Sequence, residues 1–160
     1  MNHALKPADR QSGPGDKEID FLGSVPSSMR HVVECLFFFN PRQELLVGRI
    51  RATVEETGAP YVIEADNRVW IGVPSGAMQC LFACASGGEP VGVALYCRPD
   101  PDRLRICHLA LSPEWMPSDS SHSPGLAMIM VDKLREIARS IKGVSRIQLP
   151  YRRSSFLNVR

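Results

Sequence analysis

Residues 108–131 read HLALSPEWMPSDSSHSPGLAMIMV, and they join two apolar segments through a polar loop. The segment before the loop has the character of a buried strand, and the segment after it has the character of a buried helix. Ser123 suits a helix N-cap and Pro124 suits the first helical position, so we expect the helix to begin there. The stretch therefore predicts a strand, a loop and a helix that covers a sheet.

The residues after the loop carry the clearest helical pattern in the chain. One stripe at helical spacing consists of Leu126, Met130, Leu134, Ile137 and Ile141. Charged side chains cover the opposite side, and Gly143 is placed to end the helix. Residues 144–151, which read VSRIQLPY, then predict a final strand.

The residues before the loop predict antiparallel strands. Residues 77–85, 91–98 and 104–112 are apolar runs of strand length, joined by short turns that contain Gly or Pro. Consecutive strands joined in this way pair antiparallel. Residues 61–73 predict two shorter strands around a turn at Asp66-Asn67.

The order of these elements sets the fold class. Helical spacing predicts two helices within residues 28–57, ahead of the strands. We therefore expect an α+β fold, an α/β sandwich in which a mostly antiparallel mixed sheet is flanked by helices. The predicted domain covers residues 27–153. Residues 1–26 predict a disordered N-terminal tail, and residues 154–160 predict a basic C-terminal tail.

Composition narrows the classes of function. Of the 160 residues 44% are hydrophobic and the formal net charge is +2, which favours a globular domain and makes a nucleic-acid partner unexpected. The sequence lacks an apolar run of membrane-helix length and an apolar secretory signal, so a cytoplasmic protein without a membrane partner is predicted. The cysteines lack zinc-ligand spacing, which predicts reduced core thiols and no metal site: Cys35, Cys80, Cys84, Cys97 and Cys107.

The predicted helix start is also a candidate anion site. Its first turn, from Pro124 to Ala127, presents free backbone N–H groups and the positive end of the helix dipole. Gly125 and Ala127 are small, so a phosphate can approach them closely. The alternative from these residues alone is a small first turn that packs on the sheet and binds nothing.

Several of these segments together resemble the GNAT superfamily of N-acetyltransferases. The resemblance is carried by VGVALYC from Val91, LRICHLALSPEW from Leu104, GLAMIMVDKLREIA from Gly125 and SRIQLPY from Ser145. It implies a GNAT-like fold and acetyl-CoA as the cosubstrate, with transfer of the acetyl group to an amine that the sequence does not identify. The superfamily's usual C-terminal helix and strands have no counterpart in the sequence, so we expect a GNAT-like fold that lacks them.

The resemblance also implies which residues would hold the cofactor. They are Leu109, Leu111, Ser123, Gly125, Leu126 and Ala127. The first two would align the pantetheine arm and the thioester carbonyl through backbone groups, and the others would hold the pyrophosphate at the helix start. The loop before that start is longer than is usual in the superfamily, and its Asp119 adds a charge that disfavours a nearby pyrophosphate.

Two residues are candidates for proton transfer. His108 shares strand parity with Ile106 and Ala110, and its pKa suits transfer near neutral pH, so it is a candidate base. The alternative is a core histidine that is hydrogen-bonded to a neighbour. Tyr151 lies just past the last predicted strand and is a candidate acid, with packing as its alternative role.

A function without catalysis also stays open. In this alternative the domain is a GNAT-derived interaction or regulatory module, and its shortened C-terminus leaves a sheet edge exposed. An exposed edge pairs readily with a second chain. This alternative therefore predicts a homodimer.

Overall fold

The computed structural model describes residues 18–115, 125–151 and 155–160, and it confirms the predicted fold class within them. The main sheet consists of β1 (Asp20–Leu22), β5 (Gln79–Cys84), β6 (Pro90–Asp100), β7 (Arg103–Leu111), β8 (Arg146–Gln148) and β9 (Phe156–Asn158). These strands lie side by side in the order β1-β5-β6-β7-β8-β9. Among them every neighbouring pair is antiparallel except β7 and β8, so the sheet is mixed but mostly antiparallel.

A second, smaller sheet lies ahead of β5 in the chain. It consists of β2 (Val25–Pro26), β3 (Tyr61–Ala65) and β4 (Arg68–Gly72), in the order β2-β4-β3. The hairpin between β3 and β4 turns at the predicted residues, Asp66 and Asn67, whose φ angles are 51° and 59°. Two consecutive positive φ angles match the right-handed twist of a hairpin, and Asn and Asp tolerate them best after Gly.

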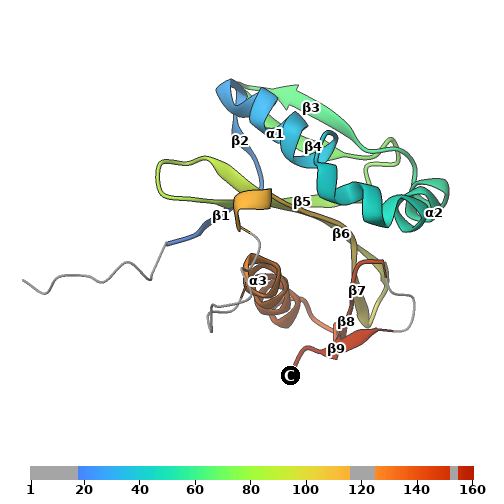
Figure 1. The fold of residues 1–160 in the computed structure, drawn as a ribbon. Helices are drawn as coiled ribbons and strands as arrows, with labels where there is room; N and C mark the ends of the chain where they lie inside the picture. Colours follow the sequence, from blue (N-terminus) through green and yellow to red (C-terminus); the bar gives the residue numbers. More distant parts are fainter. Residues whose placement is uncertain (1–17, 116–124, 152–154) are drawn as a thin grey trace, which may run out of the picture.

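Helices cover both faces of the main sheet (Figure 1). They are α1 (Arg30–Phe37), α2 (Val47–Thr57) and α3 (Leu126–Ser140), with short 3-10 helices η1 (Ser27–Met29), η2 (Pro41–Leu46) and η3 (Pro113–Trp115). α1, α2 and the small sheet lie on one side of the main sheet, and α3 lies on the other (Figure 1). We call these sides the α1/α2 face and the α3 face.

Each face has its own core. On the α3 face five buried residues of the helix pack on the sheet: Leu126, Met130, Val131, Leu134 and Ala138. Burying each of the larger side chains contributes about 1.5–3 kcal/mol. Gly92 on β6 permits this close packing, because a Cβ there would lie 2.6 Å from Met130 Sδ. On the α1/α2 face Val33, Leu36 and Phe37 of α1 pack on β5 and β6.

The structure corrects both predicted tails. Residues 20–26, which the sequence analysis assigned to the N-terminal tail, contain β1 and β2, and β1 pairs with β5 over three residues. The predicted basic tail contains β9, which pairs with β8. Strands this short are stabilised by their long-range partners, so local sequence patterns do not reveal them.

Two further expectations change. Gly125 is the N-cap of α3, with extended backbone angles of φ −63° and ψ 158°, so the helix begins at Leu126 and not at Pro124. Cys35 is exposed and Cys97 is half-buried, whereas the other three cysteines are buried as predicted. In the described ranges no helix is long and apolar enough to cross a membrane.

Candidate functional site

β7 and β8 run parallel for a short distance and then part. Three residue pairs join them, from Arg103 opposite Arg146 to Arg105 opposite Gln148. β7 then continues to Leu111, whereas β8 ends at Gln148. We call the opening between residues 107–111 and residues 149–151 the β7–β8 gap. Parallel strands that stop pairing leave backbone groups of the longer strand without a strand partner on that side.

The predicted cofactor residues Leu109 and Leu111 face this gap with their backbone groups. Hydrogen-bonded pairs alternate along the antiparallel β6–β7 ladder, so every second residue of β7 directs its N–H and C=O away from β6. The Leu109 N–H donates to the Tyr151 hydroxyl at 3.3 Å, and the Leu111 C=O accepts from the Asn40 side-chain amide at 2.6 Å. Each of these backbone groups therefore already has a protein partner, and a role toward a cofactor stays a prediction.

Tyr151 fills part of the gap. Its backbone φ is 61°, in the left-handed region that few non-glycine residues adopt. Such a conformation costs about 1–3 kcal/mol and persists where the surrounding structure holds it, often at functional sites. Burial raises the pKa of the Tyr151 hydroxyl. The hydroxyl is therefore protonated at neutral pH, and it lies against the backbone of β7, where it accepts a hydrogen bond from the Leu109 N–H.

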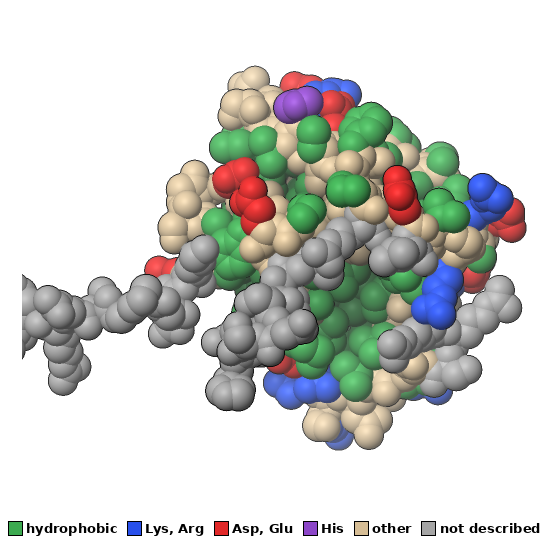
Figure 2. All heavy atoms as spheres, in the orientation of Figure 1, with side chains coloured by type: hydrophobic (Ala, Val, Ile, Leu, Met, Phe, Trp, Pro, Cys, Tyr) green, Lys and Arg blue, Asp and Glu red, His purple; other side chains and the backbone are tan. Residues whose placement is uncertain are grey.

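An apolar cavity opens from the gap on the α3 face. It has a volume of about 240 Å³ and is lined by Leu109, Ala127, Met128, Val131, Leu149, Pro150 and Leu157. Figure 2 shows hydrophobic side chains gathered in a hollow between α3 and the ends of β7 and β8. Met128 lies at this cavity and is 52% exposed, which is unusual for a large apolar side chain in the first turn of a buried helix. We call this space the α3-side cavity.

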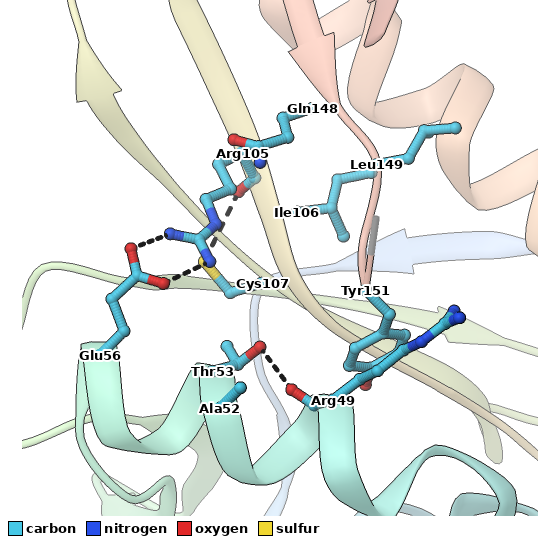
Figure 3. Close-up of a pocket in the computed structure, with 10 residues that line it drawn as sticks. All are labelled: Arg49, Ala52, Thr53, Glu56, Arg105, Ile106, Cys107, Gln148, Leu149 and Tyr151. Atoms are coloured by element: carbon cyan, nitrogen blue, oxygen red, sulfur yellow. Dashed lines mark hydrogen bonds and ion pairs between the residues drawn. The ribbon is translucent and has the colours of Figure 1, made fainter. Parts of the chain in front are cut away.

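A second cavity opens on the opposite face, between α2 and the same two strands. It has a volume of about 140 Å³, and its lining includes Arg49, Ala52, Thr53, Glu56, Arg105, Cys107, Gln148 and Tyr151 (Figure 3). Arg105 donates two hydrogen bonds to the Glu56 carboxylate, at 2.5 and 2.8 Å, at one end. Arg49 and Tyr151 lie at the other end (Figure 3). This α2-side cavity is polar and charged, and Leu149 lines both cavities.

A β-bulge in β7 arranges the side chains on this face. Leu95 of β6 lies opposite His108 and the next residue, Tyr96, lies opposite Ile106, so Cys107 is the extra residue. A bulge places two consecutive side chains on one side of a strand. Cys107 and His108 therefore both face α1 and α2, and the predicted shared parity of His108 with Ile106 is wrong.

His108 is a buried residue behind Tyr151. It is 2% exposed, and its ring makes edge contacts with the rings of Phe37 and Tyr151, at centroid distances of 5.8 and 6.3 Å. Burial, with a smaller contribution from Arg105, lowers the pKa of His108 to about 4, so the expected match to neutral pH is not found. Its Nε2 atom has no hydrogen-bond partner within the described residues. Its role as a base stays a prediction.

The remaining predicted cofactor residues lie at or beside the α3-side cavity, except Ser123, which is outside the residues that the structure describes. Ala127 lines the cavity, and Leu126 is buried beside it. Gly125 caps α3, so the first free N–H groups of the helix belong to the residues that follow it. Ser123 and Asp119 lie outside the described residues.

Sequence reasoning missed Asn40 and the Arg105–Glu56 pair. Asn40 is 6% exposed and its amide joins α1 to β7, since it donates to Leu36 O and to Leu111 O. An Asn before Pro reads from sequence as a helix cap or turn, so nothing local indicates this contact. Across the described ranges, no three His, Cys, Asp or Glu side chains are grouped to hold a metal ion.

Comparison with known proteins gives a partial structural likeness. No family model matches the sequence, and no curated protein matches it. The chain is similar to a solved structure described as the crystal structure of nourseothricin acetyltransferase, with 20% identity and a TM-score of 0.33. The match covers 54% of this chain and 48% of that chain, so it spans about half of the acetyltransferase.

Proposed function

We propose that this protein is an acetyl-CoA-dependent N-acetyltransferase, with the coenzyme on the α3 face and a small primary amine on the α1/α2 face. One observation carries the proposal. Two cavities open from the same β7–β8 gap on opposite faces of the sheet, and Leu149 lines both. Two substrates that exchange a group must meet at one point while each keeps its own binding surface, and the gap provides that point.

The α3-side cavity suits the coenzyme. Its walls are apolar, and Leu109 of β7 lines it, with the backbone of Leu109 and Leu111 facing the gap from which it opens. The pantetheine arm is an extended chain with amide groups, which pairs with such a backbone as a strand would. Free N–H groups of the first α3 turn, at Leu126 and Ala127, are suited to the pyrophosphate. This arrangement agrees with what the motif resemblance implies.

The α2-side cavity suits an amine acceptor. Its lining carries one carboxylate, that of Glu56, and the two guanidinium groups of Arg49 and Arg105, so the cavity is net positive and favours an acceptor that carries an acidic group beside a neutral amine. A cavity of about 140 Å³ admits the end of a small or extended molecule better than a folded surface. The Tyr151 hydroxyl lies between this cavity and Leu109, so it can protonate a leaving thiolate as general acid.

Acetyl-CoA supplies the thioester whose acetyl group is transferred. The chain's own residues bind it, hold the acceptor opposite it, and place a protonated hydroxyl in the gap. Burial keeps Tyr151 protonated because it raises the pKa. His108 packs behind the Tyr151 ring and holds its orientation.

Calorimetry with coenzyme A and acetyl-CoA, followed by a thiol-release assay on a panel of polyamines, amino acids and lysine peptides, tests the proposal. We expect Ala127→Trp, which fills the α3-side cavity, to weaken coenzyme binding at least about tenfold. The matched variant Ala52→Trp fills the other cavity, so it should retain coenzyme binding and lose transfer. Absence of heat and of thermal shift at millimolar acetyl-CoA would refute the proposal, as would the reverse pattern in the two variants.

The non-catalytic alternative depends on an exposed sheet edge. β9 pairs with β8 over three residues and is itself that edge. The outer strands of the sheet are β1 and β9, each three residues long, and short edge strands are a common protection against pairing between chains. A homodimer and a cytoplasmic location stay predictions, and light scattering tests the first.

A further inference from the structure

Two thiols lie together on the α1/α2 face, beside the α2-side cavity. Cys97 on β6 and Cys107 on β7 have their Sγ atoms 3.5 Å apart. The bulge in β7 turns Cys107 toward this side, and Cys107 also lines the cavity. Neither the motif resemblance nor the proposed transfer uses this pair.

The geometry favours a bond between the two sulfur atoms. A disulfide requires an S–S distance of about 2.05 Å, so the atoms must approach by about 1.5 Å in total. Rotation of the two Cys side chains can supply part of this approach, and the neighbouring bulge interrupts the regular ladder. Both residues lie in adjacent strands that stay paired, which holds the sulfur atoms near each other.

The surroundings make Cys97 the thiol that reacts first. It is half-buried and therefore accessible, whereas Cys107 is 1% exposed. The hydrogen bond from the Cys107 thiol and the charge of Arg105 lower the pKa of Cys97 to about 7, against the opposing effect of burial. The same hydrogen bond and burial raise the pKa of Cys107. An accessible thiolate beside a buried second thiol is the arrangement of a redox-sensitive pair.

The other cysteines lack this arrangement. Burial raises the pKa of Cys80 to about 12 and also raises the pKa of Cys84. Cys35 is exposed, and its described sulfur contact is with His31 Nε2 at 3.6 Å. The other three cysteines therefore serve as controls for the reactivity of the Cys97–Cys107 pair.

We propose that Cys97 and Cys107 form a redox-active dithiol, which hydrogen peroxide oxidises to an intramolecular disulfide. The Cys97 thiolate attacks one peroxide oxygen, the O–O bond breaks, and hydroxide leaves while Cys97 becomes a sulfenic acid. The Cys107 sulfur then attacks the Cys97 sulfur, the S–O bond breaks, and a second hydroxide leaves. The proton of the Cys107 thiol and one from solvent convert both hydroxides to water. Two thiols are oxidised and one peroxide is reduced.

The disulfide also changes the α2-side cavity. Because Cys107 lines that cavity, moving its sulfur toward Cys97 alters the wall between Arg105 and Tyr151. If the amine binds there, as the proposed function states, oxidation lowers the transfer rate and leaves coenzyme binding on the α3 face unchanged. This consequence rests on the proposed function, whereas formation of the disulfide does not.

Peroxide treatment of the reduced full-length chain tests the proposal. After oxidation and alkylation under denaturing conditions, we expect the number of free thiols to fall from five to three. Trypsin cleaves after Arg103 and Arg105, so the two cysteines fall in separate peptides that mass spectrometry finds joined. Dithiothreitol should restore all thiols, and the rate of oxidation should rise as the pH passes about 7.

Single substitutions identify the roles of the two residues. Cys97→Ser and Cys107→Ser should each abolish the joined peptide, and Cys35→Ser should leave it unchanged. In Cys107→Ala the sulfenic acid on Cys97 has no partner, so it should accumulate and react with dimedone. Circular dichroism confirms that each variant is folded. The proposal would be overturned by a thiol count that stays at five or by a disulfide that involves any other cysteine. It would also be overturned if Cys97→Ser lost as many thiols to peroxide as the original chain.

Discussion

The two faces of the main sheet differ in what they bury. In the described part of the chain the buried polar residues are Asn40, Thr53, His108 and Gln148. All of them lie on the α1/α2 face or in its cavity, whereas α3 buries an entirely apolar stripe. Burying a polar group without a partner costs free energy, so a fold retains such groups where they bond or act. The difference indicates that the α3 face supplies stability and an apolar cavity, and that the α1/α2 face holds the titratable chemistry.

The largest effect is expected where the two faces meet. Tyr151→Phe removes the hydroxyl from the gap and retains the ring. If this hydroxyl protonates the leaving thiolate, kcat should fall by about 10²–10⁴-fold while the affinity for coenzyme A changes little. Steady-state kinetics and calorimetry on the same preparation measure the two quantities.

A matching loss of coenzyme affinity would contradict this assignment and make Tyr151 a binding residue. Tyr61→Phe is the control, because Tyr61 is 47% exposed and lies in the small sheet. Its kinetics should match those of the original chain.

The second effect concerns the α1/α2 face and pH. Burial lowers the pKa of His108 to about 4 in the folded protein, whereas an ordinary histidine has a pKa of about 6.5. Between these values the unfolded chain binds more protons, so the free energy of unfolding falls as the pH drops from about 6.5 to 4. The loss attributable to His108 is about 3 kcal/mol, and it is absent above pH 7.

Urea unfolding at several pH values measures that loss. His108→Phe preserves an aromatic ring between Phe37 and Tyr151, so it should remove this part of the pH dependence. His31→Gln is the control, since His31 is exposed and should leave the dependence as it was. Equal slopes in the original chain and in His108→Phe would show that His108 is not held neutral by the fold.

The third effect concerns packing on the α3 face. Gly92→Ala places a Cβ 2.6 Å from Met130 Sδ and 3.2 Å from a Leu111 methyl carbon. Since both neighbours belong to the packed core, we expect a loss of about 1–3 kcal/mol in the free energy of unfolding. Gly48→Ala in α2 meets no atom within 4 Å, so it should instead stabilise the protein by roughly 0.5 kcal/mol. Denaturant unfolding measures the free energy of unfolding of both variants. Similar values for Gly92→Ala and Gly48→Ala would contradict the close packing of α3 on β6.

Much of the fold follows from patterns that are local in the sequence. The turn at Asp66-Asn67 and the antiparallel order of β5, β6 and β7 were predicted, and the structure confirms them. The predicted stripe of α3 is also found, except that the helix ends at Ser140 and Ile141 lies just past it. Helical periodicity and turn residues act over a few positions, so one sequence suffices to find them. The strands β1, β2 and β9 were missed, because two- or three-residue strands depend on distant partners.

The candidate site was predictable only in part. The strand alternation that directs Leu109 and Leu111 into the gap follows from the sequence once β7 is known. The bulge at Cys107 does not, because it reverses the parity of the residues before and after it, and no Gly or Pro marks it. Tyr151 was a candidate because of its position, but its place in the gap depends on β8 ending three residues earlier and on a left-handed backbone.

The hydrogen bond from Leu109 to Tyr151 limits the affinity that a ligand can gain from the Leu109 amide. At 3.3 Å it is a long hydrogen bond, yet it means that the Leu109 N–H already has an acceptor before a ligand binds. An incoming carbonyl would therefore swap one acceptor for another, and the swap itself adds little affinity. Selectivity must then come from how well the rest of the ligand fits the cavity that opens from the gap. The displaced Tyr151 hydroxyl would no longer accept the Leu109 N–H and could donate its own proton.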